Sequence, residues 1–223
     1  MKIIFENENF IVVDKPAGWL SVVSRDKADP RPCVATQLQA SLGTGKIWPC
    51  HRLDLEVSGL ILFAKNSESH RAANHWFEHR EVIKTYSTFS EIPTVQKDLD
   101  FLMSRLGTDV EWKSNLARGK KRAFESPHGK EAVTLARLIG PHTLLPSETS
   151  CLQWELKPKT GRSHQLRFEM YRHKTPIIGD ALYGATTKYN PNAIALRAIQ
   201  IQFLSKDFEN WGLPSEIKTT ALI

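Results

Sequence analysis

Residues 51–65 read HRLDLEVSGLILFAK, and this stretch decides how the rest of the chain is interpreted. The apolar run from Leu60 to Phe63 is typical of a strand that is buried on both faces. Arg52 and Asp54 lie two residues apart just before that run. Residues i and i+2 of an extended segment face the same side, so both side chains can reach one pocket at the mouth of the strand.

The remaining hydrophobic pattern predicts many strands and few helices. Strands are expected at residues 3–5, 10–13, 60–63, 82–89, 132–139, 152–156 and 199–203. Helices are expected at residues 34–42, 68–80 and 163–173, with Asn66 or Ser67 as the N-cap of the second. Residues 21–32 are expected to form a loop, and residues 91–130 have the least regular pattern. This distribution predicts an α+β sheet protein rather than a repeated βαβ fold.

The composition fits a globular protein of one compact domain or two tightly joined halves. The chain has 223 residues, of which 41% are hydrophobic and 24% charged. Its net charge of +6 favours a polyanionic partner, although only modestly. No signal peptide and no membrane-spanning run of about 18 apolar residues is apparent. Scattered Cys33, Cys50 and Cys151 fit a reducing compartment, so we expect a cytoplasmic protein that does not bind membranes.

Two polar clusters are candidates for a functional site. One is the HRLD stretch at residues 51–54, and the other is GRSHQLR at residues 161–167, followed by PIIGDALYG at residues 176–184. Each cluster alone is also typical of surface salt bridges or of a helix start with solvated charges. Their occurrence together, in this order and with Lys84-Thr85-Tyr86 between them, is far more specific.

The sequence resembles the RluA-type RNA pseudouridine synthases. The resemblance is carried by the motifs HRLDLEVSGLILFAK, KTYST, GRSHQLR and PIIGDALYG, with FIVVDKPAGW near the start and GKEAVT at residues 129–134. It spans about residues 3 to 204, and Val57 stands where the family usually has Thr. The resemblance implies the pseudouridine synthase fold, a mixed and largely antiparallel central sheet flanked by helices and loops, with a catalytic cleft across the sheet. It further implies a single catalytic domain over residues 1–223, without the N-terminal S4-like domain that is frequent in the family.

The implied reaction is the isomerisation of specific uridines in rRNA or tRNA, which needs no cofactor or metal. By resemblance, Asp54 is the essential acid, which either adds to the sugar or base as a nucleophile or stabilises the cation-like sugar. Its implied partner is Arg167, which would oppose the rise in carboxyl pKa that burial causes. Tyr86 resembles the tyrosine that stacks on the target base.

The resemblance also implies residues that contact RNA. Arg52 would enter the RNA helix as the target nucleotide is flipped out, and Arg162 and His164 of the second motif are expected near the same site. His51 either takes part there or only orders the loop. Further contacts to phosphate are expected from the basic cluster, which we define as Arg118, Lys120, Lys121 and Arg122, although a solvated loop is an equally good interpretation.

Two other functions fit these residues less well. A non-catalytic RNA-binding protein with this fold would have no use for Asp54, Tyr86 and Arg167 together. A metal hydrolase using His51, Asp54 and His164 lacks a ligand set with suitable spacing. We therefore expect an RNA-modifying isomerase that acts as a monomer.

Overall fold

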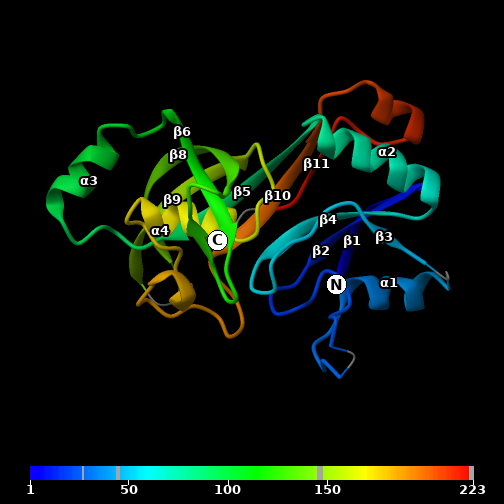
Figure 1. Ribbon diagram of the computed structural model, residues 1–223, viewed down its shortest axis with the longest axis horizontal. Helices are drawn as coiled ribbons and strands as arrows, with labels where there is room; N and C mark the ends of the chain where they lie inside the picture. The colour runs from blue at the N-terminus through cyan, green and yellow to red at the C-terminus, as the bar shows by residue number, and fades with distance from the viewer. Residues whose placement is uncertain (27, 44–45, 145–147, 221–223) are drawn as a thin grey trace. The chain divides into compact units, whose positions relative to one another are not determined.

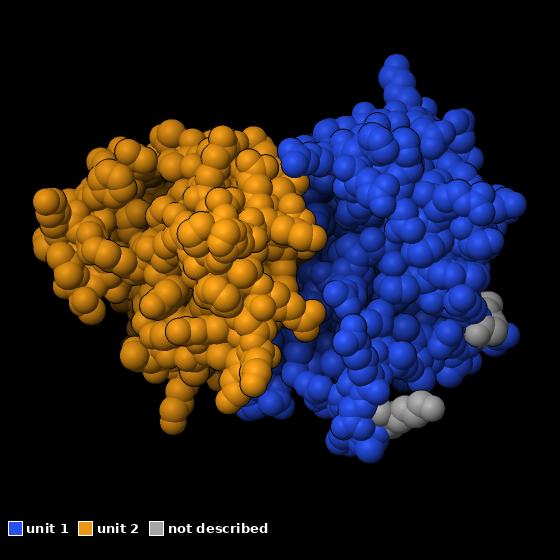
Figure 2. Space-filling view, in the orientation of Figure 1, with its two compact units in different colours: residues 1–84, 191–193, 197–220 blue, residues 85–190, 194–196, 221–223 orange. Residues whose placement is uncertain are grey.

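The computed structural model describes residues 1–26, 28–43, 46–144 and 148–220. By its internal contacts the chain divides into two compact units, which are coloured separately in Figure 2. Of the described residues, unit 1 comprises those within 1–84, 191–193 and 197–220, and unit 2 comprises those within 85–190 and 194–196. Two strands, β5 (Val82–Ser90) and β10 (Leu196–Phe203), carry the chain from one unit to the other.

Unit 1 is built on a mixed sheet with a helix on each face (Figure 1). Its strands lie in the order β1-β2-β4-β10, with β3 paired to β4 and β11 to β10. The pairs β1–β2 and β2–β4 are antiparallel, whereas β4 and β10 are parallel. The further elements of this unit are β1 (Lys2–Glu6), β2 (Phe10–Lys15), α1 (Val34–Leu42), β3 (Trp48–Pro49), β4 (Ser58–Ala64), α2 (Ser67–Glu78), η2 (Asp207–Trp211) and β11 (Glu216–Lys218).

The alternation of side chains along β2 and β4 builds two hydrophobic cores in unit 1. Val12 and Leu62 point to the face covered by α2, where they pack with Trp76. Val13 and Phe63 point to the opposite face, which α1 covers. Because both faces are covered, β4 is apolar without interruption from Leu60 to Ala64, as residues 60–63 predicted.

Gly59 explains why the sequence has small residues, Ser58 and Gly59, at the start of β4. Its φ is +110°, and a Cβ atom there would lie 2.2 Å from the carbonyl oxygen of Ala198 in β10. Only glycine allows the start of β4 to approach the neighbouring strand so closely.

Unit 2 is built on an antiparallel sheet in the order β5-β9-β8-β6-β7. Helix α4 packs on this sheet through Phe168, which joins Leu116, Ala132 and Tyr183 in a core cluster. The further elements of this unit are α3 (Gln96–Met103), β6 (Asp109–Arg118), β7 (Ala123–Glu125), β8 (Lys130–Leu144), β9 (Thr149–Pro158), α4 (Gln165–Arg172) and η1 (Ala181–Tyr183).

The fold confirms the predicted α+β class and most predicted elements, but one expectation was wrong. Residues 91–130 are not irregular: they contain α3, β6 and β7. Residues 34–42 form the predicted helix with the predicted bounds, and Asn66 caps α2 by accepting a hydrogen bond from the amide of Ser69 at 2.8 Å. Among the described residues, no helix combines the length and apolar character needed to cross a membrane.

Candidate active site

The loop that carries Asp54 is held by hydrogen bonds to the backbone on both sides of that residue. The hydroxyl of Ser21 donates to the carbonyl of Leu53 at 2.8 Å and accepts from the amide of Leu53 at 3.1 Å. The carbonyl of Leu55 accepts from the amide of Gly18 at 2.8 Å. Within the loop, the amide of Val57 donates to the carbonyl of Asp54 at 3.2 Å. These bonds fix the position of the Asp54 backbone.

A buried lysine adds a further bond to this loop. The ammonium of Lys15 donates to the carbonyls of Pro16, Trp19 and Leu55 at 3.0, 2.8 and 3.1 Å, and the side chain is fully buried. Burial lowers the pKa of Lys15 to about 8, while the negative charges of Asp54 and Glu56 act in the opposite direction. Lys15 therefore supports the geometry of the loop through its bond to Leu55.

His51 has a structural position at the start of the same loop. Its Nε2 accepts a hydrogen bond from the amide of Leu62 in β4 at 3.1 Å. Burial, together with the positive charge of Lys84, lowers the pKa of His51 to about 3, so the ring is neutral at physiological pH. Because Nε2 is already engaged by an amide, this geometry favours the interpretation that His51 orders the loop. The adjacent Cys50 is buried, and burial raises the pKa of its thiol, which makes it a poor nucleophile.

Lys84 and Tyr86 lie two residues apart on β5 and therefore on the same face of that strand. The ring of Tyr86 is 7% exposed, and the residue lies opposite Leu156 of β9. Burial lowers the pKa of Lys84 to about 8, and its ammonium lies 5.7 Å from the centre of the Phe77 ring. The strand thus presents a buried phenol on the same face as a lysine whose pKa is lowered by burial.

Arg167 is held in α4 by a partner that sequence reasoning missed. Its Nε and Nη2 donate to the two carboxylate oxygens of Asp180 at 2.7 and 2.8 Å. Both side chains are almost completely buried, at 2% and 1% exposure. The guanidinium carbon also lies 5.4 Å from the centre of the Tyr183 ring. A guanidinium has five N–H donors, so a second carboxylate can still bind to the same group.

The remainder of the GRSHQLR segment is organised by Gln165. Its side-chain oxygen accepts from the hydroxyl of Thr160 at 2.8 Å and from the amide of Arg162 at 3.0 Å. Its side-chain nitrogen donates to the carbonyl of Val133 at 3.0 Å and to the hydroxyl of Thr134 at 2.9 Å. A buried glutamine with this many partners locks the start of α4 to β8, although the sequence analysis gave it no role.

The two predicted RNA-contact residues of this segment are tied to neighbouring elements. His164 caps α4 in a left-handed conformation with φ of 53°, and its Nδ1 lies 3.3 Å from the hydroxyl of Tyr183. Arg162 donates through Nε to the carbonyl of Glu131 at 2.8 Å. The hydroxyl of Tyr183 also accepts from the amide of Ala123 at 2.7 Å, so this network reaches the end of the β6–β7 turn.

The basic cluster forms the turn between β6 and β7. Arg118, Lys120, Lys121 and Arg122 are exposed, and the amide of Gly119 closes the turn on the carbonyl of Arg122 at 3.0 Å. In the part of the chain that the structure describes, these four side chains take part in no salt bridge. Arg52 is exposed as well and likewise has no described ion-pair partner. Long, exposed and unpaired cations of this kind suit contacts to phosphate.

The predicted residues are distributed over both units. His51, Arg52 and Asp54 share one loop of unit 1, whereas Tyr86, Arg162, His164 and Arg167 belong to unit 2. The described residues contain no group of three or more His, Cys, Asp or Glu side chains arranged to hold a metal ion. The pairing of Asp54 with Arg167 stays a prediction.

Comparison with known proteins identifies the family. The family model described as RNA pseudouridylate synthase matches residues 9–172. The chain belongs to the RluA-type RNA pseudouridine synthases. It is 30% identical over 220 residues to tRNA pseudouridine synthase C of Vibrio parahaemolyticus, covering 92% of this chain and 85% of the relative. It is also 30% identical to the dual-specificity RNA pseudouridine synthase RluA of Pasteurella multocida, covering 95% of this chain and 90% of the relative.

Solved structures support the same fold for this pseudouridine synthase. Human RNA pseudouridylate synthase domain containing 1 aligns with a TM-score of 0.71 at 21% identity, over 98% of this chain and 82% of that one. Human RNA pseudouridylate synthase domain containing 4 aligns with a TM-score of 0.69 at 20% identity, over 99% and 88%. The fold agrees with the family assignment, which makes the chain an isomerase that acts on RNA, as its motifs predicted.

Proposed function

We propose that this enzyme converts uridine to pseudouridine in tRNA or rRNA, with Asp54 as its essential carboxylate. The observation that carries the proposal is the bracing of the Asp54 loop by Lys15, Gly18 and Ser21. A group that stabilises developing charge must be fixed before the reaction begins, because reorganising it during the reaction would raise the barrier. Relatives named for tRNA and for dual specificity support the choice of RNA.

The proposed reaction exchanges one bond of the uracil ring for another. The bond between N1 and C1′ breaks, the uracil rotates, and C5 bonds to C1′; C5 loses a proton and N1 gains one. Asp54 either forms a transient bond to the sugar or base, or stabilises the positive charge on the sugar while the base is detached. Tyr86 holds the free uracil by its ring face, because stacking tolerates rotation better than a fixed set of hydrogen bonds.

The remaining charged residues are assigned to orientation and RNA binding. Arg167, preoriented by Asp180, is proposed to pair with Asp54 and keep it ionised in a site that excludes water. Arg52 is proposed to fill the gap left by the flipped nucleotide, with Arg162 and His164 nearby, and the basic cluster to contact phosphate. We place the enzyme in the cytoplasm and expect it to act as a monomer on RNA, without a cofactor.

The replacement Asp54→Asn tests this assignment. It preserves the shape of the side chain and removes its charge, so RNA affinity should stay within about twofold while pseudouridine formation is lost. Pseudouridine mapping in RNA from cells with and without the gene identifies the target uridine, and a stem-loop carrying that uridine serves for both assays. Wild-type turnover in Asp54→Asn would refute the assignment.

A further inference from the structure

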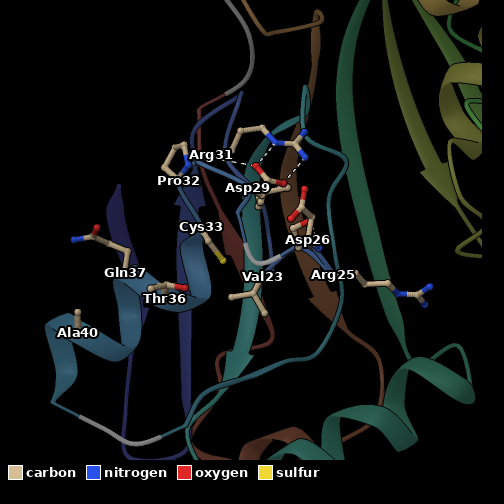
Figure 3. Close-up of a pocket in the computed structure, with 12 residues that line it drawn as sticks. Val23, Arg25, Asp26, Asp29, Arg31, Pro32, Cys33, Thr36, Gln37 and Ala40 are labelled. Atoms are coloured by element: carbon tan, nitrogen blue, oxygen red, sulfur yellow. Dashed lines mark hydrogen bonds and ion pairs between the residues drawn. The ribbon is translucent and has the colours of Figure 1, made fainter.

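A cavity of about 700 Å³ lies in unit 1 between the loop at residues 20–32 and α1. Figure 3 shows Thr36, Gln37 and Ala40 on α1, with Val23 on the side towards which Thr36 points, and the Arg31–Asp29 ion pair at one end. The volume lies within the range of roughly 300–1,000 Å³ that is typical of small-molecule sites.

The cavity is attached directly to the loop of Asp54. Ser21 follows Leu20, a residue that lines the cavity, and it makes the two hydrogen bonds to Leu53 described above. The neighbouring Leu20 lines the cavity and joins its walls, because its amide donates to the carbonyl of Pro32 at 2.8 Å and its carbonyl accepts from the amide of Val34 at 2.9 Å. A ligand in the cavity would therefore be bound at a fixed place relative to the backbone of residue 54.

The charges at one end of the cavity also connect it to that loop. Arg31 donates through Nε and Nη2 to the carboxylate of Asp29 at 2.8 and 2.6 Å. The hydrogen bond to Asp29 raises the pKa of Arg31 most, and the negative charge of Glu56 adds to the effect. Glu56 stands two residues after Asp54, so this end of the cavity lies within electrostatic reach of the Asp54 loop.

The lining matches the chemistry of a nucleobase. Leu20, Val23 and Ala40 supply apolar wall surface, which suits the flat faces of a base. The amide of Gln37 and the hydroxyl of Thr36 form no side-chain hydrogen bond with another described residue, and they provide donors and acceptors for the edge of a base. The polymer that reaches the Asp54 loop is RNA, and unpaired bases are the part of RNA that proteins read most readily.

We propose that this cavity binds one unpaired nucleobase of the RNA substrate, close in sequence to the target uridine. The inference rests on the proposed function, since it takes Asp54 to mark the position of that uridine. A base seated between Val23 and α1 would contribute to selecting the RNA, because an RNA with that nucleotide paired or absent would lose the contact.

Filling the cavity tests the proposal. Ala40→Trp places a large side chain at a position that lines the cavity, whereas Ser41→Trp places the same side chain at the next position of α1, which is equally exposed but does not line the cavity. With the mapped stem-loop as substrate, Ala40→Trp should lower kcat/KM by roughly tenfold, the scale set by the stacking of a single base. The loss should appear mainly as a higher KM, because the base does not react. Ser41→Trp should retain wild-type values.

A second set of measurements locates the base and covers the case in which Ala40→Trp does not fold. Stem-loops in which each nucleotide near the target is made abasic in turn are assayed with wild-type protein, Ala40→Trp and Gln37→Ala. At one position, removing the base should weaken the wild type and leave the variants unchanged, because both changes delete the same contact. Circular dichroism and thermal unfolding identify any variant that is misfolded. If Ala40→Trp is misfolded, the result with Gln37→Ala decides whether the cavity binds a base.

The outcomes separate the two proposals. If wild-type protein modifies the stem-loop and the folded variants match it on every substrate, the cavity binds no base and this inference is overturned. An equal loss on all abasic substrates would also overturn it, because the variants would then act through the fold. Absence of pseudouridine with wild-type protein and the mapped RNA would instead refute the proposed function.

Discussion

Replacing Lys15 by Met should destabilise the protein, and the effect should grow at alkaline pH. The change removes the Lys15 donor from three partly buried carbonyls, and of these the carbonyl of Leu55 still accepts from the amide of Gly18. Hydrogen bonds from a charged donor contribute about 1.5–3 kcal/mol each, but the variant is also relieved of the cost of burying a charge. We expect a net loss of about 2 kcal/mol in the free energy of unfolding at pH 7.

The pH dependence follows from the lowered pKa of Lys15. Folding lowers that pKa from 10.5 to about 8, so the unfolded chain binds the proton more tightly. The cost of charging the buried amine is fully present below pH 8 and disappears as the pH rises towards 10.5. At about 1.4 kcal/mol per pKa unit, the wild type should gain about 2–3 kcal/mol from this residue between pH 7 and 10, and Lys15→Met should not.

Urea unfolding at pH 7, 8, 9 and 10 measures this difference. Other groups that titrate in the range, including Lys84 with its pKa of about 8, are present in both proteins and cancel when the two curves are subtracted. The gap between wild type and Lys15→Met should widen steadily with pH. A gap that stays constant from pH 7 to 10 would refute the claim that Lys15 is charged and buried at neutral pH.

Three further changes probe other parts of the site. Asp180→Asn breaks a buried ion pair with Arg167 and should lower the free energy of unfolding, measured in urea, by about 3–5 kcal/mol. The control Asp109→Asn, in the exposed pair with Arg137, should change that free energy little. Equal losses in the two variants would contradict this prediction. Changing Lys120, Lys121 and Arg122 together to Ala should reduce the steepness of the plot of log RNA affinity against log salt concentration by roughly two. The single-turnover rate of pseudouridine formation should stay the same. An unchanged slope would show that the basic cluster does not contact RNA. His51→Gln keeps an acceptor for the Leu62 amide but has no group that titrates. Because the pKa of His51 is lowered to about 3, the wild type should lose about 3 kcal/mol in the free energy of unfolding between pH 6.5 and 4, and the variant should not. An equal loss of stability in the variant over this pH range would contradict the prediction.

Local patterns predicted the parts of the fold in which one segment determines its own structure. The run from Leu60 to Phe63 identified β4, and Asn66 identified the start of α2. Strand β6 was missed although Trp112, Ser114 and Leu116 alternate with exposed residues, because the serine interrupts the apolar face. The hydroxyl of Ser114 donates to Glu169 in α4, a buried partner 55 residues away that no local pattern contains.

The same limit applies to the candidate site. Motifs led us to propose Asp54, Tyr86 and Arg167 as site residues, but they did not point to Lys15, which bonds to the Asp54 loop, or to Asp180, which orients Arg167. Asp180 is the acid of the PIIGDALYG stretch, and an acid within an otherwise apolar and glycine-rich segment is a signal that a buried cation lies nearby. Lys15 gave a weaker signal, because a lysine before Pro16 is equally typical of an exposed turn.

Both charged groups proposed for the chemistry are fixed by residues that need not touch the RNA. Lys15, Gly18 and Ser21 hold the backbone around Asp54, and Asp180 orients Arg167. Because this bracing lies within one unit in each case, each group is positioned by its own unit before substrate binds. A fixed charge in a buried site stabilises a developing charge without reorganisation, whereas the desolvation of Lys15 and of the Arg167–Asp180 pair lowers the stability of the fold. Replacing both members of the buried Arg167–Asp180 pair by apolar residues of similar size should therefore separate stability from catalysis, because the fold no longer bears the cost of burying the two charges while the group proposed to pair with Asp54 is lost.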